Sequence, residues 1–460
     1  MATGWNFEHT YARLPPIFYR NQQPATAPVP KIVLFNDDLA RALGLDAEKL
    51  KNSPEIFAGA VLPNGVSPIS QAYAGYQFGH FAMLGDGRAV LLGEHITSDG
   101  RRLDIQLKGS GPTPFSRSGD GFAALLPMLR EYIVSEAMHA LGIPTTRSLA
   151  VALTGRDIMR EKPLLGAVLT RVATSHIRAG TFSYISAYGT PADLQKLADY
   201  CIWRHFPHIV EEESKYLLLL REAARLQADL IAQWQLVGFV HGVMNTDNMA
   251  ISGETIDYGP CAFMDTYHPD TVFSSIDVHG RYAYKNQPHI GAWNLATFAE
   301  ALLPLLHQDK NKAVELAKTE IESYHKQYDQ NWLAGMRGKL GLADQNPEDN
   351  SLIAELLDLM QEHKLDYTNT FRQQFVAPQL ASWREKWLAR QSCTDIMKKH
   401  NPAVIPRNHR VEEVLAAADH GDFAPMHDLL DALRKPYEDS PIYSTTPESP
   451  SCNHRTFCGT

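Results

Sequence analysis

The chain has 460 residues, of which 44% are hydrophobic, and this hydrophobic content excludes an intrinsically disordered protein. The 43 basic and 52 acidic residues give a net charge of −9, which argues against a protein that coats nucleic acid. No apolar run approaches the roughly 20 residues that a membrane-spanning helix needs, so we expect neither nucleic acid nor a membrane among the partners.

The first 70 residues have a mixed composition with two proline-containing stretches, Pro15-Pro16 and residues 24–30. They predict an irregular N-terminal extension with one short helix near residues 37–43. Residues 1–8 lack the basic and then apolar pattern of a secretory signal. We therefore expect the protein in the cytoplasm.

A strand pattern begins after residue 84. Residues 89–93 are apolar, residues 98–100 form a Ser-Asp-Gly turn, and residues 103–108 alternate strictly between apolar and polar. This combination predicts a β-hairpin. Since alternate side chains of a strand share a face, Lys108 lies with the polar residues opposite the apolar face, where it can point into a cleft.

The rest of the chain predicts a small strand-rich lobe with one helix, followed by a larger helical lobe. The single helix covers about 122–141 and ends at a Gly-Ile-Pro sequence, and short strands follow near 148–153 and 166–171. Beyond Thr190-Pro191, an N-cap and first-turn pair, the pattern is mainly helical. The expected helices cover 192–206, 212–237 and 293–306, with more across 310–440, before a loose tail that begins after Pro436.

The first candidate site residues are the glycines of the sequence Leu-Gly-Asp-Gly-Arg at 84–88. Without a side chain, Gly85 and Gly87 let backbone N–H groups approach phosphates, and Arg88 adds a positive charge. An ordinary hairpin turn explains the same residues equally well.

The second candidate is the pair of Lys108 and Glu131, which are 23 residues apart on the predicted strand and helix. Protein kinases hold nucleotide phosphates with a strand lysine that is paired with a helix glutamate. Taken alone, the pair is explained more simply as two surface residues.

The strongest candidate is a loop that contains His241, Asp247 and Asn248, followed nine residues later by Asp257-Tyr258-Gly259. A kinase has a His-containing catalytic loop with a metal-binding Asn, followed by a metal-binding Asp, an aromatic residue and Gly. Asn248 and Asp257 fit these metal ligands. Val243 stands where a kinase has its catalytic Asp, so either Asp247 takes the role of the base or the chemistry is a different phosphoryl reaction.

Further basic and polar residues complete the candidate site. Arg171 and Arg178 are seven residues apart, and guanidinium groups suit polyphosphate oxygens, with surface salt bridges as the alternative. Asp120 and Gly121 follow the lysine strand in a Gly/Ser-rich connection that could cover a nucleotide.

Several ordered stretches together carry a resemblance to a known family: residues 73–81, 84–94, 104–117, 119–140, 171–182, 241–259 and 277–282. They resemble the selenoprotein O family, which consists of protein adenylyltransferases built on a pseudokinase fold. The match is dense between about 70 and 285 and weaker toward both ends.

This resemblance implies an α+β, protein-kinase-like fold of two lobes. The expected boundaries are an N-terminal extension at 1–70, an N-lobe with nucleotide-binding loops at 71–180, a helical C-lobe at 181–435, and a cysteine-containing tail at 436–460. ATP would bind in a flipped orientation with Mg²⁺ or Mn²⁺. AMP would pass to Ser, Thr or Tyr hydroxyls of protein substrates, this protein itself included.

The resemblance also implies roles for individual residues. Asp247 would accept the proton, Asn248 and Asp257 would hold the metal, and Glu131 would orient Lys108. The residues expected to contact the nucleotide are Gly85, Gly87, Arg88, Lys108, Asp120, Gly121, Arg171, Arg178 and Asp257.

Cys458 matches the position of selenocysteine in some members of this family, some of which pair this residue with a cysteine in the activation segment. Residues 271–275, where that partner is expected, contain no cysteine. A Cys452–Cys458 pair, a pair between Cys261 and the tail, and free thiols are the hypotheses that remain.

Three other activities compete with AMP transfer: UMP transfer with Mn²⁺, ordinary phosphorylation, and nucleotide binding by a catalytically inactive pseudokinase scaffold. The intact set of Lys108, Glu131, Asn248 and Asp257 favours catalysis, because a scaffold needs no pair of metal ligands.

Overall fold

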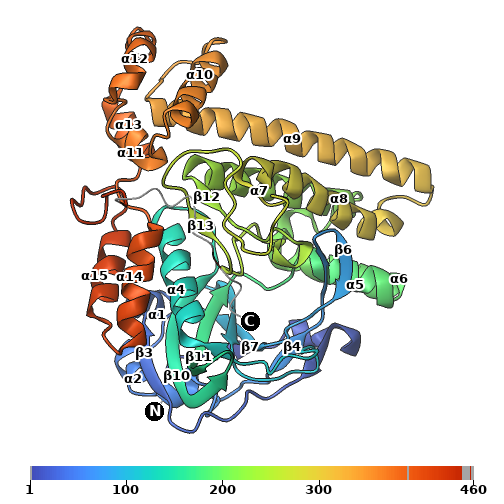
Figure 1. The fold of residues 1–460 in the computed structure, drawn as a ribbon. Coiled ribbons are helices and arrows are strands. Elements are labelled where there is room, and N and C mark those ends of the chain that lie inside the picture. The colour runs from blue at the N-terminus through green and yellow to red at the C-terminus, as the bar shows by residue number, and fades with distance from the viewer. Residues whose placement is uncertain (1–2, 391–392, 448–455, 457–460) are drawn as a thin grey trace.

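The computed structural model describes residues 3–390, 393–447 and 456. Figure 1 shows a strand-rich lobe, which holds the N-terminal part of the chain, beneath a larger helical lobe. This arrangement confirms the expected two-lobed α+β architecture. Among the described residues, no helix combines the length and the apolar character that crossing a membrane would require.

The centre of the smaller lobe is an antiparallel sheet with the strand order β2-β4-β7-β8-β11-β10-β3, to which β1 and β9 add short pairings with β7 and β11. Its strands are β1 (Phe7–Glu8), β2 (Tyr19–Asn21), β3 (Lys31–Phe35), β4 (Ile69–Gln71), β7 (Ala89–Ile96), β8 (Arg102–Lys108), β9 (Ala123–Ala124), β10 (Arg147–Met159) and β11 (Pro163–Ala173). The β7–β8 hairpin confirms the alternating pattern, and its register places Ala89 opposite Lys108.

The first 70 residues are more ordered than an irregular arm. They supply β1, β2, β3 and β4 to the sheet and form the helices α1 (Asp37–Ala42), α2 (Ala47–Lys51) and α3 (Pro54–Phe57). The predicted short helix is α1, which begins after Asn36, whose side chain accepts a hydrogen bond from the Leu39 N–H. Local patterns do not predict these strands, because each is short and pairs with a distant segment.

The helix of the small lobe is α4 (Leu125–Ala140), three residues shorter at its start than predicted because Ala123 and Ala124 pair with β11. Its apolar face packs on the sheet and on α14 (Asn408–Asp419) and α15 (Ala424–Leu433) in a shared core. Figure 1 shows these two helices, in red, beside α4. The last helices of the chain therefore fix the helix that carries Glu131.

Three further differences from the predicted elements occur near the site. Strands β10 and β11 run several residues beyond their predicted ends as one long hairpin. The helix α5 (Ala179–Tyr188) was not expected, because its glycine, serines and aromatic residues have low helix propensity. A separate hairpin of β5 (Ala74–Gln77) and β6 (His80–Met83) stands next to α5.

The larger lobe contains the predicted helices in the predicted order: α6 (Pro191–His205), α7 (Lys215–Leu236), α8 (Gln287–Leu306) and α9 (Lys310–Leu340), then α10 (Asp349–Glu362), α11 (Tyr367–Arg372), α12 (Ala381–Leu388) and α13 (Thr394–His400). Thr190 and Asp193 form a capping box at the start of α6. Short 3-10 turns are η1 (Tyr11–Arg13), η2 (Pro16–Phe18), η3 (Pro207–Ile209), η4 (Thr246–Asn248), η5 (Tyr284–Asn286) and η6 (Pro378–Leu380).

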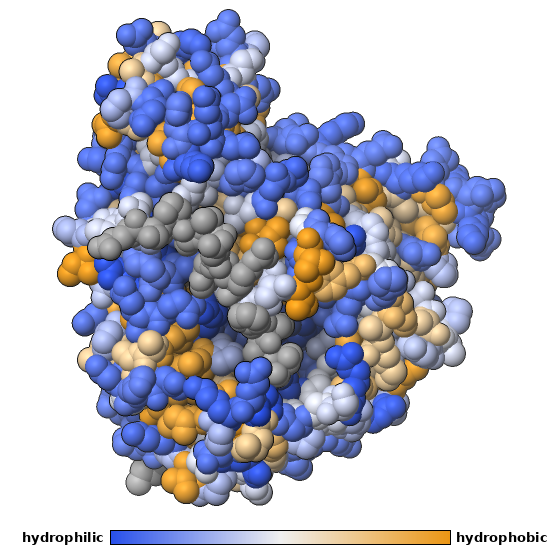
Figure 2. All heavy atoms as spheres, in the orientation of Figure 1, coloured by the Kyte–Doolittle hydropathy of each residue, from blue (hydrophilic) through white to orange (hydrophobic). Residues whose placement is uncertain are grey.

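The surface in Figure 2 is mainly hydrophilic, with hydrophobic side chains in small separate groups. Residues 436–447 contain no helix or strand, and Asp439 among them pairs with Arg372. Cys452 and Cys458 lie outside the described residues, so the hypotheses about the tail thiols are not addressed. Cys261 is buried and free, and burial raises the pKa of its thiol to about 12.

Candidate active site

A cavity of about 1380 Å³ is lined by residues of both lobes. All twelve residues selected from the sequence line it: Gly85, Gly87, Arg88, Lys108, Asp120, Gly121, Glu131, Arg171, Arg178, Asp247, Asn248 and Asp257. Residues that are up to 172 positions apart in the sequence thus surround one space, as the combination of motifs predicted.

The deepest part of the site is a cluster of ion pairs around Asp257. Lys108 Nζ lies 2.5 Å from Glu131 Oε2 and 2.9 Å from Asp257 Oδ1. Arg171 Nη1 lies 2.5 Å from the same Asp257 oxygen, and Arg178 Nη1 donates to Oδ2. The Lys108, Glu131 and both arginine side chains are at most 7% exposed, so none of them is an ordinary surface residue.

The electrostatics of this cluster are set by burial and by three cations. Burial would raise the pKa of Asp257, but Arg171, Lys108 and Arg178 hold it well below its usual value. Burial lowers the pKa values of Arg171 and Arg178, but Asp257 raises that of Arg171, and Tyr73 and then Asp257 raise that of Arg178, so both end above their usual value. Lys108, Arg171 and Arg178 thus bring three cationic groups to one end of the cavity, and such groups are the usual partners of phosphate oxygens.

The loop that carries Asp247 lies between β12 (Phe239–Val240) and β13 (Ala262–Phe263), two paired strands. His241 is buried, and its Nε2 lies 3.0 Å from the Ile256 carbonyl oxygen, which links the loop to the residue before Asp257. Asn248 Nδ2 donates to the Val243 carbonyl at 2.8 Å. The histidine and the asparagine amide therefore fix the loop, and Val243 contributes only its backbone.

Asp247 lies in this loop with one carboxylate oxygen buried and, among the described residues, without a hydrogen-bond partner. Burial raises the pKa of Asp247 to about 6, against the opposing effect of Arg178. Arg178 Nη1 also donates to the Asp247 backbone carbonyl at 2.6 Å. A Cβ at Gly75 of β5 would lie 2.0 Å from Asp247 Oδ1, so only glycine allows the hairpin to approach this closely.

The glycine loop at 85–87 connects β7 to the rest of the site. Gly85 has a φ of 106°, and a Cβ there would meet the Phe115 ring at 2.5 Å. Between the glycines, the buried Asp86 side chain accepts hydrogen bonds from the Gln71 N–H at 3.0 Å and from Gln106 Nε2 at 3.2 Å. Burial raises the pKa of Asp86 to about 6.

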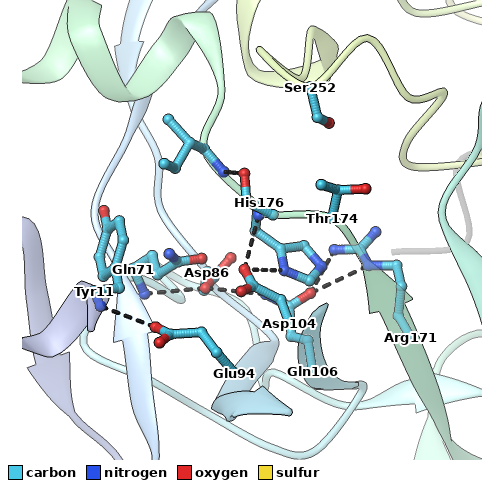
Figure 3. Close-up of polar contacts among 12 residues, drawn as sticks. Tyr11, Gln71, Asp86, Glu94, Asp104, Gln106, Arg171, Thr174, His176 and Ser252 are labelled. Atoms are coloured by element: carbon cyan, nitrogen blue, oxygen red, sulfur yellow. Dashed lines mark hydrogen bonds and ion pairs between the residues drawn. The ribbon is translucent and has the colours of Figure 1, made fainter. Parts of the chain in front are cut away.

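Asp86 and Gln106 are site residues that the sequence analysis did not select. Gln106 Oε1 accepts from Arg171 Nη2 at 2.5 Å, so a chain of contacts runs from the glycine loop to the arginine (Figure 3). The alternation of β8 already placed Gln106 on the same face as Lys108. That shared face was the signal that could have identified it.

Asp120 and Gly121 line the cavity at its rim, away from the ion cluster. Asp120 Oδ2 pairs with Arg160 Nη1 at 2.7 Å, and its side chain is partly exposed. The pairing lowers the pKa of Asp120, with the Arg160 hydrogen bond as the main cause. This segment can therefore cover a ligand in the cavity. Its Asp120 side chain pairs with Arg160 and is not part of the ion-pair cluster around Asp257.

The wall of the cavity near α4 comes from α14, whose residues Glu412, Leu415, Ala416, Asp419 and His420 line it. Glu412 pairs with Arg130 of α4. No local sequence pattern predicts this wall, because the helix near the C-terminus and the helix near residue 130 are far apart in the chain.

The residues present fit a divalent cation held together with a ligand. Asn248 and Asp257 offer the oxygen donors that Mg²⁺ and Mn²⁺ prefer. The described part of the chain contains no cluster of three His, Cys, Asp or Glu side chains that could hold a metal alone. Phosphate oxygens are therefore needed to complete the coordination of a cation at these two residues.

A strand lysine paired with a helix glutamate, followed by a His-containing loop and an Asp-aromatic-Gly sequence, defines a protein-kinase-like nucleotide site. Comparisons with known proteins specify the family. The model of the family described as "Protein adenylyltransferase SelO" matches residues 2–389. The chain belongs to this family of nucleotidyltransferase enzymes, which confirms the resemblance found in the sequence.

Curated relatives agree along the full length of the chain. Proteins named "Protein nucleotidyltransferase YdiU" are 57% identical in Geobacillus kaustophilus, with all of both chains covered, and 58% identical in Bacillus cytotoxicus, with 100% of this chain and 98% of the relative covered. Among solved structures, the kinase domain of a rhoptry antigen from Toxoplasma gondii is 11% identical. The match covers 74% of this chain and 92% of that domain, with a TM-score of 0.26.

Proposed function

We propose that this chain transfers AMP from ATP to Ser, Thr or Tyr hydroxyls of proteins, with the β- and γ-phosphates of ATP held among Lys108, Arg171 and Arg178. The observation that carries the proposal is the convergence of these three cations on Asp257 at the buried end of the cavity. Adenylyl transfer also fits the family to which the chain belongs. The expected location of the reaction is the cytoplasm.

The buried position of the cations supports the flipped orientation of ATP. A kinase exposes the γ-phosphate to its acceptor, whereas cations at the buried end of a cavity favour burial of the terminal phosphates. The α-phosphate then lies nearer to the opening and to Asp247. Gly85, Gly87, Arg88 and Gly121 would contact the rest of the nucleotide from the loops that line the cavity.

Asn248 and Asp257 would hold Mg²⁺ or Mn²⁺, which when bound neutralises charge on the phosphate oxygens. Arg171, Lys108 and Arg178 hold the pKa of Asp257 well below its usual value, so its carboxylate is ionised at neutral pH. Glu131 fixes the position of Lys108 through its 2.5 Å contact.

Asp247 is the group proposed to accept the proton of the acceptor hydroxyl. Asp247 lines the cavity, and burial raises the pKa of its carboxyl to about 6, which suits a group that accepts a proton near neutral pH. As the proton moves to Asp247, the hydroxyl oxygen forms a bond to the α-phosphorus, and the bond between the α-phosphorus and the bridging oxygen breaks. Pyrophosphate leaves with its negative charge stabilised by Lys108, Arg171 and Arg178.

The experiment that tests this proposal is intact-mass analysis of an acceptor protein, and of the chain itself, after incubation with Mg²⁺ and either ATP or UTP. We expect the acceptor to gain the mass of AMP from ATP. A gain of the mass of a phosphate group would indicate a kinase, and a gain of UMP with Mn²⁺ alone would indicate uridylyl transfer. If nucleotide binds and no acceptor changes in mass, the scaffold hypothesis is supported instead.

A further inference from the structure

A second cavity, of about 450 Å³, contains features that the nucleotide site does not use. One side comes from Phe78 at the turn of the β5–β6 hairpin, and the opposite side comes from residues 276–281 and the start of α8. We call this cavity the lateral groove. Phe78 has a φ of 51°, a left-handed conformation that is rare for an aromatic residue and that holds its ring at the groove.

Two apolar side chains of the groove face solvent. Ile276 is 60% exposed and Val278 is 78% exposed, and both lie in a segment without helix or strand. Next to them, Ile290 of α8 is buried, so the groove has an apolar base as well as apolar edges. Exposed apolar residues that border a cavity are typical of a surface that binds a partner.

The lining of the groove carries one formal positive charge, on Arg281, and one formal negative charge, on Asp277. The Arg281 guanidinium lies over the Trp293 ring, 4.9 Å from its centroid, and in the described part of the chain it forms no ion pair with a carboxylate. The exposed side chains of His279 and His289 lie at the same groove. The one carboxylate, Asp277, is buried and accepts the N–H groups of Arg281 and Tyr282.

The groove is directly connected to the loop that carries Asp247. The Phe78 ring packs 5.3 Å from the ring of Tyr282, centroid to centroid, and the Tyr282 hydroxyl donates to Asn245 Oδ1 at 2.5 Å. Asn245 caps η4, the turn that contains Asp247. The hairpin that holds Phe78 is bonded to the same turn, since the Tyr76 N–H donates to Thr246 Oγ1 at 3.2 Å.

The segment before the groove pairs with Thr456 through its backbone. The Thr456 N–H donates to the Phe273 carbonyl at 2.9 Å, and the Ser275 N–H donates to the Thr456 carbonyl at 3.1 Å. Thr456 also lines the nucleotide cavity. The backbone of residues 273–275 therefore has hydrogen-bonding groups that can pair with another segment, and it lies between Thr456 at the nucleotide cavity and Ile276 at the groove.

We propose that the lateral groove binds an extended segment of the acceptor protein, one that carries an apolar residue and an acidic residue near the hydroxyl to be modified. The apolar residue packs on Ile276, Val278 and Phe78, and the acidic residue pairs with Arg281. The proposal rests on the proposed function, because it assigns the groove to the acceptor of the transfer reaction.

The test uses three synthetic peptides with one threonine each, and fluorescence anisotropy measures their binding to the full chain. The first peptide has Leu and Glu beside the threonine, the second has Leu and Lys, and the third has Ser and Glu. We expect the first to bind about tenfold more tightly than the others, a difference of about 1.4 kcal/mol. We expect Val278→Asp and Arg281→Gln to remove this preference. Val376→Asp and Arg225→Gln, at exposed positions elsewhere, are the matched controls.

Equal affinity for the three peptides, or unchanged binding in both groove variants, would overturn the proposal. Binding that appears only in a chain ending at residue 447 would assign the groove to the chain's own C-terminal segment, and it would also contradict the proposal. Peptide binding is measured without nucleotide, so it is independent of transfer. Selective peptide binding without AMP transfer would support the groove proposal and contradict the proposed function. AMP transfer without selective peptide binding would support the proposed function and contradict the groove proposal.

Discussion

Asp257 is the residue on which the chemistry of the site depends most. Lys108, Arg171 and Arg178 all contact its carboxylate, so its removal would leave three buried cations without their shared partner. The negatively charged oxygens of a bound triphosphate can pair with the same three cations, as the Asp257 carboxylate does. The cluster is thus organised before a nucleotide arrives, which is the condition for strong electrostatic stabilisation of a leaving group.

The role of Asp247 can be separated from nucleotide binding by a substitution. Asp247→Asn keeps the shape of the side chain but cannot accept a proton, so we expect kcat for AMP transfer to fall by about 10²–10⁴-fold. ATP affinity, measured by calorimetry, should change little. Asp270→Asn, at an exposed carboxylate, is the control. Transfer at the normal rate in Asp247→Asn would assign the proton to another group.

Gln106 is predicted to position Arg171. Gln106→Leu removes one partner from Arg171 and one from Asp86, and a lost hydrogen bond to a charged group costs about 1.5–3 kcal/mol. We expect KM for ATP to rise by about tenfold or more. Gln106→Glu can still accept from Arg171 but places a second carboxylate against Asp86, so we expect it to restore the ATP affinity only in part. An unchanged KM in Gln106→Leu, with the protein folded, would show that Arg171 needs no such support.

At the scale of elements, the packing of α14 and α15 on α4 links the last part of the chain to the nucleotide site. Leu415 of α14 is buried in the shared core and also lines the cavity. Leu415→Ala should lower the free energy of unfolding by about 2–5 kcal/mol and raise KM for ATP, because α4 carries Glu131. Thermal unfolding and ATP titration measure the two effects, and Arg434→Ala at an exposed site is the control. Lower stability with an unchanged KM would limit α14 to a structural role.

Local patterns predicted the elements that local interactions determine. The alternation at 103–108 predicted β8, the Thr190-Pro191 pair predicted the start of α6, and the order of motifs predicted which residues line the cavity. Elements that depend on distant contacts were missed or shortened. The pairing of β1 with β7, the helix α5 and the cover of α4 by α14 each require a partner far along the chain, which no short window of sequence reveals.

The same distinction applies to the site. Lys108, Asn248 and Asp257 stand at spacings that a kinase-like site requires, so their positions could be predicted. Asp86 was visible only as part of a glycine turn, and Gln106 only as a polar residue on the face of Lys108. Their contact with each other, and with Arg171, depends on the register of β7, β8 and β11.

For the whole molecule, the two lobes supply complementary parts of one candidate site. Lys108, Glu131 and Arg171 come from the strand-rich lobe, and Asn248 and Asp257 come from loops of the helical lobe. Two protein ligands hold a divalent cation weakly without phosphate oxygens. We expect a chelator to abolish transfer and added Mg²⁺ or Mn²⁺ to restore it. We also expect calorimetry to detect tight metal binding only when ATP is present. Tight binding without nucleotide would contradict this assignment.

The central claim is that the α-phosphorus of ATP, and not the γ-phosphorus, is attacked. The most direct measurement incubates the chain with Mg²⁺, an acceptor protein and ATP labelled at either the α- or the γ-phosphate. The account predicts label on the acceptor from α-labelled ATP and none from γ-labelled ATP, together with loss of that label in Asp257→Asn. Label from the γ-phosphate alone would make the chain a kinase and would contradict both the proposed transfer and the flipped orientation of the nucleotide.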